Sequence, residues 1–280
     1  MTSSTTLRYP AVDLALAQRL ERAEVLATIA YVEARGSLQP GGRGWLHRAG
    51  VHAVFDGPSS PLTQSFGLGA FEPPTSEVFE ELESFFSSRG VATAHEVSAL
   101  ASPSTWDRLS ARGYSPLEAS TVLLRPTAHP PAHQSKRVAA RLIASDEGPS
   151  WCRVLTAGLA SESAELASAV DDLAPVMARC VGAHCFIAEL DGAPVAAGIV
   201  AIQNGVAVLG GASTLPAARR QGAQAALLQA RLEYAAELGV DLAMLVAAPG
   251  SSSQRNAERK GFRPAYVRSK WVRPLGPEQT

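Results

Sequence analysis

The residues Ser213-Thr214-Leu215-Pro216-Ala217-Ala218-Arg219-Arg220-Gln221-Gly222-Ala223-Gln224-Ala225 lead from an apolar run into a long helical pattern. Gly222 allows the main chain to approach a ligand closely. The helix that follows begins with unpaired N–H groups and a positive dipole end, and Arg219 and Arg220 add charge beside it. Such a helix start suits a pyrophosphate. Because an arginine pair before a helix is also common as a solvated turn, the flanking segments decide between the two interpretations.

These flanking segments predict an α/β (α+β) fold with a mixed, mostly antiparallel twisted sheet flanked by helices. Asp191-Gly192 and Asn204-Gly205 are typical hairpin turns and separate three apolar runs. The predicted strands are 183–190, 194–202, 206–212, 241–247 and 265–272. The predicted helices are 151–159, 163–173, 221–238 and 251–260, the last two closed by Gly239 and Gly261. A strand, a helix and a returning strand imply one parallel pair in the sheet.

A repeat at an offset of 148 to 149 residues divides the chain into two halves. Arg112-Gly113-Tyr114-Ser115-Pro116 corresponds to Lys260-Gly261-Phe262-Arg263-Pro264, and Leu124-Arg125-Pro126 corresponds to Val272-Arg273-Pro274. Gly90-Val91 likewise matches Gly239-Val240. The alternative explanation is that these matches arise by chance, because Gly and Pro often stand at the ends of helices. We therefore expect one topology twice, as domains at 1–128 and 137–280 joined by a Pro- and His-containing linker at 129–136.

Composition excludes several classes of protein. The 280 residues are long enough for two cores, and 25 basic against 26 acidic residues leave a net charge of −1. We therefore expect neither a nucleic-acid partner nor a membrane partner. Three cysteines cannot all pair within one chain, and the N-terminus lacks the pattern of a leader peptide. The expected location is the cytoplasm, as a monomer or homodimer.

The order of segments resembles the GNAT superfamily of acyl-CoA N-acyltransferases over about 130 residues, the C-terminal half. Two motifs carry the resemblance. Arg219-Arg220-Gln221-Gly222-Ala223-Gln224 is similar to the family's Arg/Gln-x-x-Gly-x-Gly/Ala turn, and Asn256-Ala257-Glu258-Arg259-Lys260-Gly261-Phe262 is similar to its Gly-Phe-terminated helix. The resemblance implies an acetyl-CoA-dependent acetyltransferase, with acetyl-CoA as cosubstrate and an amine as acceptor.

The resemblance also implies where coenzyme A binds. Backbone amides of the turn would hold the pyrophosphate, and the sheet would splay beside the preceding strand to admit the pantetheine arm. The residues implied at the phosphates are Arg219, Arg220, Gln221, Gly222, Ala223 and Gln224. Ser213, Thr214 and Leu215 would line the pantetheine, with Ser252 and Asn256 nearby.

The chain departs from the family pattern at three places. Gln224 replaces a Gly or Ala of the turn, which would either crowd it or add an amide contact to the phosphate. Ala257 stands where many members carry a tyrosine that can protonate the leaving thiolate, and Asn256 is no acid of comparable strength. Strand 206–212 has no carboxylate to serve as a general base.

The catalytic groups therefore stay unassigned, with several weak candidates. Tyr266 and Tyr234 are candidate acids, although tyrosines on strands and helices usually pack with a hydrogen-bonded tip. The candidate bases are Glu189, Asp172, His95 and Glu96, for each of which a solvated or structural position is the commoner alternative.

The first half lacks the phosphate turn. A shift of 148 residues places Arg219 and Gly222 at Phe71 and Pro74, in a segment with Glu72 and two prolines. This composition repels phosphate and removes N–H donors, so we expect a degenerate GNAT-like domain without cofactor. Such tandem arrangements occur in the superfamily. This half is expected to shape the acceptor pocket through residues such as His52, Asp56, His95 and Glu96.

The cysteines give no strong site. Cys180, His184 and Cys185 are close in sequence but lack the second cluster of a structural zinc site, so we expect no metal. Buried small hydrophobes are a better interpretation of these cysteines than acyl-carrying nucleophiles. The function expected is acetyl transfer to a small-molecule amine; the alternatives are a non-catalytic acyl-CoA sensor or interaction protein, and an acyltransferase for an aminoacyl or peptide amine.

Overall fold

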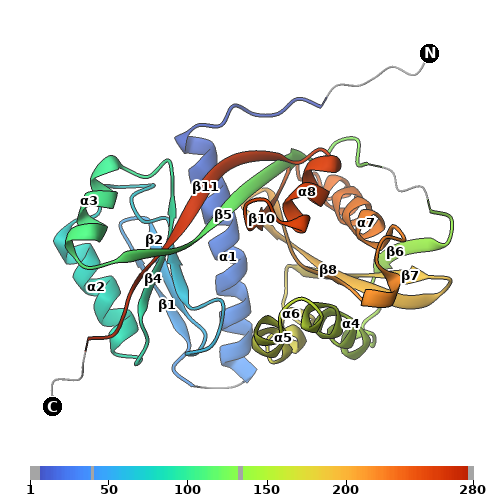
Figure 1. Ribbon diagram of the computed structural model, residues 1–280, viewed down its shortest axis with the longest axis horizontal. Coiled ribbons are helices and arrows are strands. Elements are labelled where there is room, and N and C mark those ends of the chain that lie inside the picture. Colours follow the sequence, from blue (N-terminus) through green and yellow to red (C-terminus); the bar gives the residue numbers. More distant parts are fainter. Residues whose placement is uncertain (1–6, 39–40, 132–134, 277–280) are drawn as a thin grey trace. The chain divides into compact units, whose positions relative to one another are not determined.

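The computed structural model describes residues 7–38, 41–131 and 135–276, and the chain forms two compact units (Figure 1). The C-terminal unit comprises residues 1–11, 123–245 and 255–263. The N-terminal unit comprises residues 12–122, 246–254 and 264–280. The predicted boundaries at residues 128 and 137 divide the sequence into halves, whereas the compact units also take short segments from the opposite half.

The C-terminal unit contains a mixed sheet with the strand order β5-β10-β9-β8-β7-β6. These strands are β5 (Ser115–Pro126, of which the last residues belong here), β6 (Val138–Leu142), β7 (Ala183–Leu190), β8 (Ala193–Gln203), β9 (Val206–Thr214) and β10 (Leu242–Ala247). Strands β6 to β9 pair antiparallel, and β10 pairs parallel to β9. The predicted meander and parallel pair are confirmed, while β6 was not predicted.

Local turn chemistry sets this meander. Asp191 and Gly192 have φ angles of 51° and 82°, and Asn204 and Gly205 have 50° and 68°. Two consecutive left-handed residues make the type I′ turn, whose twist matches that of a two-residue hairpin. Asn, Asp and Gly accept these angles at little cost, which explains why these two turns could be identified from sequence.

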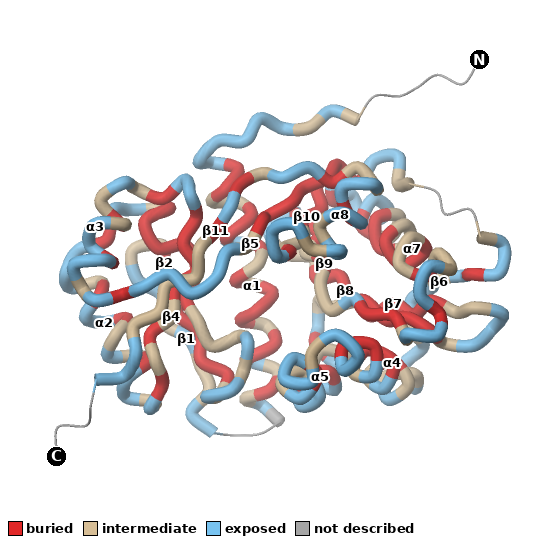
Figure 2. Tube along the Cα trace, in the orientation of Figure 1, coloured by how far each residue is buried: buried red, intermediate tan, exposed pale blue. Residues whose placement is uncertain are grey.

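Helices cover both faces of the sheet in the C-terminal unit (Figure 1). They are α4 (Gly148–Ala160), α5 (Ala164–Asp171) and α6 (Ala174–Met177) on one face and α7 (Ala223–Glu237) on the other, with α8 (Ser252–Arg259) after β10. The central strands β7 and β8 are consequently buried along most of their length (Figure 2). Trp151 of α4 is fully buried, and its Nε1 donates to the carbonyls of Phe186 and Gly198 at 3.1 and 3.2 Å.

The N-terminal unit repeats this order of elements. Its elements are α1 (Leu14–Leu38), β1 (Gly44–Arg48), β2 (Val51–Phe55), β3 (Gln64–Phe66), α2 (Ser76–Ser87), β4 (Thr93–Ser98), α3 (Pro103–Ala111) and the first part of β5. Two antiparallel pairs, β1–β2 and β2–β3, precede a parallel one between β3 and β4, whereas three antiparallel pairs precede the parallel pair of the C-terminal unit. Helix α1 was not predicted.

The last strand of each half lies in the sheet of the other unit. Strand β11 (Arg263–Arg273) pairs antiparallel with β4, from Arg268 opposite Ser98 to Arg273 opposite Thr93. The final residues of β5 lie beside β10 in the C-terminal unit. The predicted strand at 265–272 therefore exists, but from Pro264 onward it completes the N-terminal unit.

A buried ionic cluster fixes β11 inside the N-terminal unit. Arg268 is 2% exposed, and its Nη1 lies 2.5 Å from a Glu24 carboxylate oxygen and 3.4 Å from one of Glu21. Its Nε lies 3.7 Å from Glu96, which also faces Lys270. Burial raises the pKa of Glu21 to about 7, because the charged carboxylate loses its hydration. Three carboxylates around one guanidinium tie the end of the chain to α1 and β4.

Within the described ranges, the helices are too short or too polar for any of them to span a bilayer.

Candidate functional site

Strand β9 parts from β10 halfway along its length. The parallel ladder consists of three pairs, and the last joins Val208 to Met244. On its other edge β9 continues to pair with β8 as far as Thr214. From Leu209 onward the edge of β9 that faces β10 therefore has no ladder partner. The expectation that a pantetheine arm binds beside this strand stays a prediction.

A β-bulge marks the same place. The register of β8 against β9 passes from Ala197 opposite Ser213 to Ile199 opposite Gly210, so β9 has one extra residue. Gly211 within the bulge has a φ of 49°. Bulges redirect the main chain and are common beside active sites. Because three small residues, 210–212, form this bulge, its backbone is accessible to a ligand in the opening.

The turn after β9 leads into the start of α7. A short 3₁₀ helix, Pro216–Ala218, is followed by Arg220 with a φ of 63° and by Gly222 with a φ of 97° at the N-cap of α7. The left-handed Arg220 is a strained position for a side chain with Cβ. Within the described part of the chain, the backbone N–H groups of residues 220–225 have no acceptor. A row of free donors at the start of a 15-residue helix is a ready anion site.

The first arginine of the turn has a structural contact. Arg219 donates through Nε to the Thr214 carbonyl at 3.3 Å and through Nη2 to the Gly158 carbonyl at 3.5 Å. Nη2 also contacts the Ser161 hydroxyl and lies 3.2 Å from the Glu162 carboxylate. Arg219 therefore fastens the end of β9 to the last turn of α4. Its placement differs from the expectation that it points at phosphates.

The remaining polar side chains of the turn are Arg220, Gln221 and Gln224, and the two glutamine amides donate to residues that precede the turn. Arg220 is exposed. Gln221 Nε2 donates to the Ala217 carbonyl at 3.1 Å, and Gln224 Nε2 donates to the Thr214 hydroxyl at 2.8 Å. Gln224 thus crosses from α7 to the end of β9 instead of crowding the row of amides. The backbone of Ala223 and Gln224 and the Arg220 side chain are left for the ligand.

The residues that precede the turn belong to the core. Ser213 and Thr214 are 2% and 6% exposed, and the Ser213 hydroxyl donates to the Leu155 carbonyl of α4 at 2.8 Å. Leu215 is half-buried, and its N–H donates to the Val195 carbonyl at 2.9 Å. Their side chains position β9, so a pantetheine arm would meet the strand's backbone.

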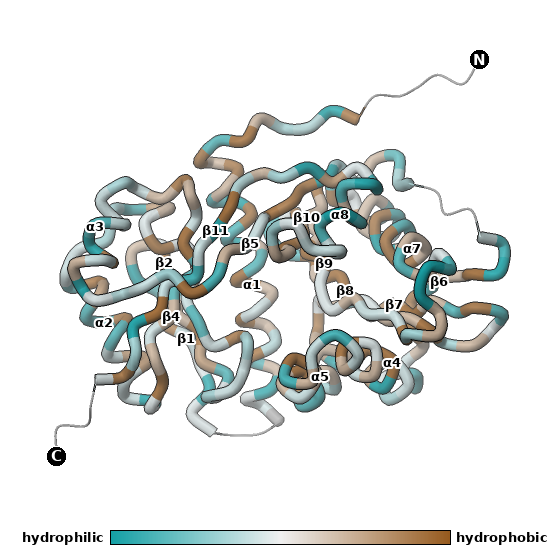
Figure 3. The backbone as a smooth tube through the Cα atoms, viewed as in Figure 1, coloured by the Kyte–Doolittle hydropathy of each residue, from teal (hydrophilic) through white to brown (hydrophobic). Residues whose placement is uncertain are grey.

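Helix α8 confirms the second motif but supplies no acid. Gly261 has a φ of 85° and ends the helix, and Phe262 donates its N–H to the Ala257 carbonyl at 3.0 Å. Ala257 is 4% exposed and carries no ionisable group. Asn256 is exposed and accepts from Arg259 Nη1 at 2.8 Å. Ser252, also exposed, begins this helix, whose surface is hydrophilic (Figure 3).

The candidate catalytic groups of the C-terminal unit have other partners. Glu189 lies on β7, and its Oε1 accepts from Arg141 Nη2 at 2.6 Å. The Tyr234 hydroxyl contacts His184 Nδ1 at 2.9 Å. Asp172 is exposed after α5. No described contact joins any of these residues to the bulge or to the turn of α7.

The candidates of the N-terminal unit are buried. Tyr266 is 7% exposed and donates its hydroxyl to Glu21 at 2.8 Å, and burial raises its pKa far above the ordinary value. Glu96 belongs to the Arg268 cluster described above. His95 is fully buried, and burial lowers its pKa to about 3. These environments favour structural roles.

Two further residues that were expected to shape the acceptor pocket, His52 and Asp56, also make contacts inside the N-terminal unit. His52 stacks on His47 with ring centroids 4.3 Å apart, and burial and this neighbour lower its pKa to about 4. Asp56 is 1% exposed and accepts from Arg35 Nη1 at 2.9 Å. The expectation that they line an acceptor pocket stays untested.

The equivalent turn of the N-terminal unit is closed. The Thr75 hydroxyl caps α2 by accepting from the Val78 N–H at 3.3 Å. Phe71 fills the loop, where added Cβ atoms on Gly50 and Gly67 would lie 2.3 and 2.9 Å from its side chain. The Arg22 guanidinium lies over the same ring, 4.8 Å from its centroid. A capped helix and a filled loop leave no cradle for a phosphate.

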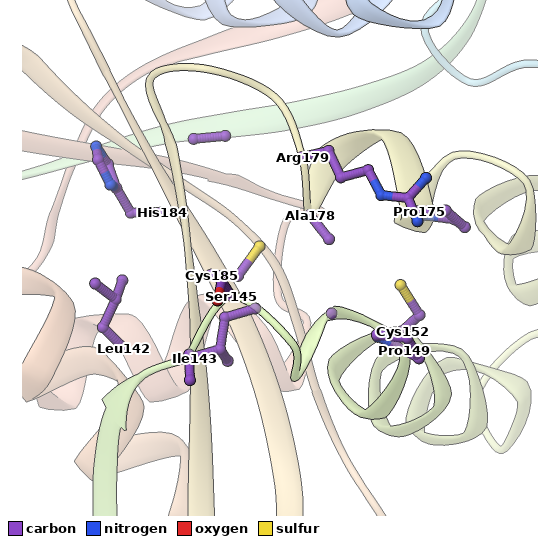
Figure 4. A pocket seen from close by; sticks show the side chains of 13 residues that line it. Leu142, Ile143, Ser145, Pro149, Cys152, Pro175, Ala178, Arg179, His184 and Cys185 are labelled. Atoms are coloured by element: carbon purple, nitrogen blue, oxygen red, sulfur yellow. The ribbon is translucent and has the colours of Figure 1, made fainter. Parts of the chain in front are cut away.

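A cavity of about 460 Å³ lies elsewhere in the C-terminal unit (Figure 4). Its walls come from the β6–α4 connection, α4, α6 and the start of β7, and no residue of the turn lines it. The residues with polar side chains in its lining are Ser145, Cys152, Arg179, His184 and Cys185. Burial raises the pKa of both thiols, to about 12 for Cys185, so they are protonated at neutral pH. The part of the chain that is described contains no group of three or more metal-ligating side chains.

One residue of the site region was not anticipated. Arg231 of α7 is 3% exposed and faces the sheet, where Nη1 donates to the carbonyls of Ile199 and Gly210 at 3.1 and 3.3 Å. The available signal was its helical spacing from Leu228, Leu232 and Ala235, which places a charged residue on the buried face of the helix.

The comparisons with known proteins agree with this geometry. The Acetyltransferase (GNAT) family matches residues 159–262. A GCN5-related N-acetyltransferase from Kribbella flavida superposes with a TM-score of 0.63 at 20% identity, covering 90% of this chain and 96% of the other. No match was found among curated proteins.

Two further solved structures are similar over nearly the whole chain. A tandem GNAT protein from the clavulanic acid biosynthesis pathway gives a TM-score of 0.60 at 14% identity, with 96% and 98% of the two chains covered. A GCN5-related N-acetyltransferase from Sphaerobacter thermophilus gives 0.58 at 16% identity, with 97% and 98% covered. At these identities the likeness establishes the shared fold, which extends over both units.

Proposed function

We propose that the chain, whose residues 159–262 match the GNAT family and whose fold is similar to that of a tandem GNAT protein, is an acetyl-CoA-dependent N-acetyltransferase whose acceptor is a small-molecule amine. The cosubstrate binds at the turn between β9 and α7. The N-terminal unit, whose equivalent loop is filled by Phe71, carries no cofactor. The protein acts in the cytoplasm and needs no metal.

One observation carries the proposal. The backbone N–H groups of residues 220–225 have no acceptor within the described chain and lie at the start of α7, directly after the unpaired edge of β9. Amides at a helix start bind phosphate oxygens, and an open strand edge offers hydrogen bonds to the amides of pantetheine. Both features together match the two polar parts of coenzyme A.

The reaction is a direct acyl transfer. The neutral amine nitrogen bonds to the acyl carbon, the carbon–sulfur bond breaks, and the coenzyme A thiolate leaves with the electron pair. The proton lost by the nitrogen goes to solvent water. The side chains of the described bulge, Gly210, Gly211 and Ala212, have no ionisable group, so acceptors that are partly neutral at working pH should react fastest.

Calorimetric titration with acetyl-CoA tests the cofactor site. The wild type should bind in the micromolar range that is common for enzyme substrates. Arg220→Glu should abolish binding without altering the circular dichroism spectrum, because it places a carboxylate beside the pyrophosphate. Arg153→Glu, the same charge change on an exposed position of α4, is the matched control and should bind as the wild type does. No binding by the wild type would refute the proposal.

The second candidate function is a non-catalytic acyl-CoA sensor. The observation that favours it is the buried Ala257, which leaves α8 without the expected acid. Release of free thiol from acetyl-CoA in the presence of a broad panel of amines separates the two functions. Turnover with any amine supports the transferase, and binding with background thiol release supports the sensor. Aminoacyl and peptide amines belong in the panel, because the chemistry of attack is the same.

A further inference from the structure

Arg231 is a buried cation with no carboxylate partner among the residues that the structure describes. Its guanidinium donates to three carbonyls, those of Leu227, Ile199 and Gly210, at 3.1, 3.1 and 3.3 Å. Burial lowers its pKa to about 10 and no charged neighbour contributes, so the group stays protonated at neutral pH. An unpaired buried charge is costly, and an apolar side chain would stabilise a helix against a sheet better. Stability alone therefore does not explain an arginine here.

The surroundings of Arg231 are shaped to hold it. Ile199 and Gly210 are register partners on β8 and β9, and Gly210 is the first residue of the bulged segment 210–212. Gly198, the neighbour on β8, lacks the Cβ that would lie 3.1 Å from the guanidinium carbon. One side chain thus joins α7 to both strands at the point where their register shifts.

The same point is where β9 leaves β10. The last pair of that ladder, Val208 with Met244, comes two residues before Gly210. A bulge with glycine at two positions has little intrinsic stiffness, since glycine allows many backbone angles. Hydrogen bonds from a fixed guanidinium restrict these angles and hold the carbonyls toward α7.

We propose that Arg231 is a positioning residue for acyl transfer: it fixes the bulge at residues 210–212 so that the open edge of β9 keeps one geometry toward the thioester. This role rests on the proposed function. Its charge also lies beneath the strand along which the thioester would bind, and it favours the negative charge that develops on the acyl oxygen. Arg231 thereby contributes positive potential in a site whose bulge has no ionisable side chain.

Hydrogen exchange of the free protein tests the positioning directly. Arg231→Met removes the donors at similar volume, Arg231→Lys keeps the charge with one donor group, and Gln229→Met is the control on the same helix. Exchange in the segment 206–214 should rise about tenfold in Arg231→Met and less in Arg231→Lys, while 183–190 stays unchanged. Gln229→Met should match the wild type. Unchanged exchange at 206–214 in Arg231→Met would overturn the proposal.

Steady-state kinetics and calorimetry with acetyl-CoA test the consequence for transfer. Arg231→Met should lose about 100-fold in kcat, as expected for a lost preorganised dipole or charge, while its Kd for acetyl-CoA changes less than about threefold. Arg231→Lys should recover part of kcat. If Arg231→Met does not fold, Arg231→Lys alone decides, with a loss of about tenfold in kcat at unchanged Kd.

The outcomes separate the two levels of inference. A wild type that binds no acetyl-CoA refutes the proposed function and the transfer role together. A wild type that transfers acetyl groups while Arg231→Met keeps more than half of kcat refutes only the role of Arg231. A loss confined to the Kd for acetyl-CoA also refutes it, because that result makes Arg231 part of general binding.

Discussion

At the scale of the residue, neighbours decide what a functional group does. Arg219 and Arg220 are adjacent and chemically identical. The Arg219 side chain joins the Thr214 carbonyl of β9 to the Gly158 carbonyl of α4 and the Glu162 carboxylate. Arg220, in contrast, has a left-handed conformation. The left-handed angle turns the chain between them, so the two side chains serve different elements. The sequence predicts the same role for both residues, because both side chains are arginine.

His95 illustrates the same principle for a candidate base. The Tyr114 hydroxyl donates to Glu83 at 3.1 Å, so His95 Nε2 donates to Tyr114 and Nδ1 accepts from Ser65 at 2.5 Å. Both nitrogens are used, and the ring is neutral because burial lowers its pKa to about 3. A residue in this state contributes to packing and cannot exchange protons with a substrate.

A pH dependence of stability follows from His95. Its pKa lies near 6.5 in the unfolded chain and near 3 in the fold, so the unfolded state binds more protons between these values. The neutral His95 ring makes its full contribution to the free energy of unfolding above pH 6.5. This contribution is lost as the pH falls, by up to about 1.4 kcal/mol per pH unit. Urea unfolding at pH 7, 6 and 5 should show a steeper loss for the wild type than for His95→Gln. Parallel curves would contradict the assignment.

At the scale of the element, α4 and β9 pack closely where β9 approaches the turn. A Cβ on Gly158 would lie 2.4 Å from the Ser213 hydroxyl oxygen and 3.0 Å from the Thr214 nitrogen. These contacts are far inside van der Waals distance, and one of the neighbours is backbone. The packing of α4 on the sheet therefore depends on a glycine in the last turn of the helix.

Gly158→Ala should consequently destabilise the protein, although alanine is the better helix former. Overpacking of this kind costs about 1–3 kcal/mol, measured as a lower free energy of unfolding in urea. Because the displaced residues lead into the turn, acetyl-CoA binding should weaken as well. Gly148→Ala is the matched control in the same helix, since its Cβ would meet nothing closer than 3.8 Å. Equal stabilities of the two variants would contradict this account.

At the scale of the whole molecule, the two halves of the sequence are not separate folding units. The N-terminal unit needs β11, which pairs with β4 and brings Arg268 to Glu21, Glu24 and Glu96. Without β11 these carboxylates would lose Arg268 and Lys270, the cations that face them, and the edge of β4 would be unpaired. The repeat in the sequence is therefore a repeat of topology and not of independent domains.

Cutting the chain tests this dependence. A fragment of residues 1–128 should show no cooperative urea transition by circular dichroism, whereas the same fragment with residues 264–276 joined to its end by a flexible linker should regain one. The reason is that the added strand restores both the β4 ladder and the buried cation. Arg268→Met in the joined fragment is the control and should lose the transition again. Cooperative unfolding of 1–128 alone would contradict the inference.

Several elements of this protein could be predicted from its sequence, because they depend on interactions between residues that are close together in the chain. The two I′ hairpins, the glycine-closed helices α7 and α8 and the phosphate turn depend on residues within a few positions of one another, and the order of strands followed from them. The loss of the turn in the first half was equally local, because two prolines and a glutamate cannot bind phosphate. Helix α1 and strand β6 were not predicted, although α1 has a local signal in Asp13, whose side chain accepts from the Leu16 N–H at 2.8 Å at the start of the helix.

Tertiary structure decided the rest. The apolar pattern of residues 265–272 suits the edge of either sheet, and only the pairing with β4 and the burial of Arg268 assign it to the N-terminal unit. The separate duties of Arg219 and Arg220, the buried state of His95 and the contact of Arg231 with the bulge depend on residues far apart in the chain. The sequence alone determined the fold and the turn that we propose for the cofactor, because turns and caps are local. Packing determined which residues are partners across the sheet, because many partners satisfy the same sequence pattern.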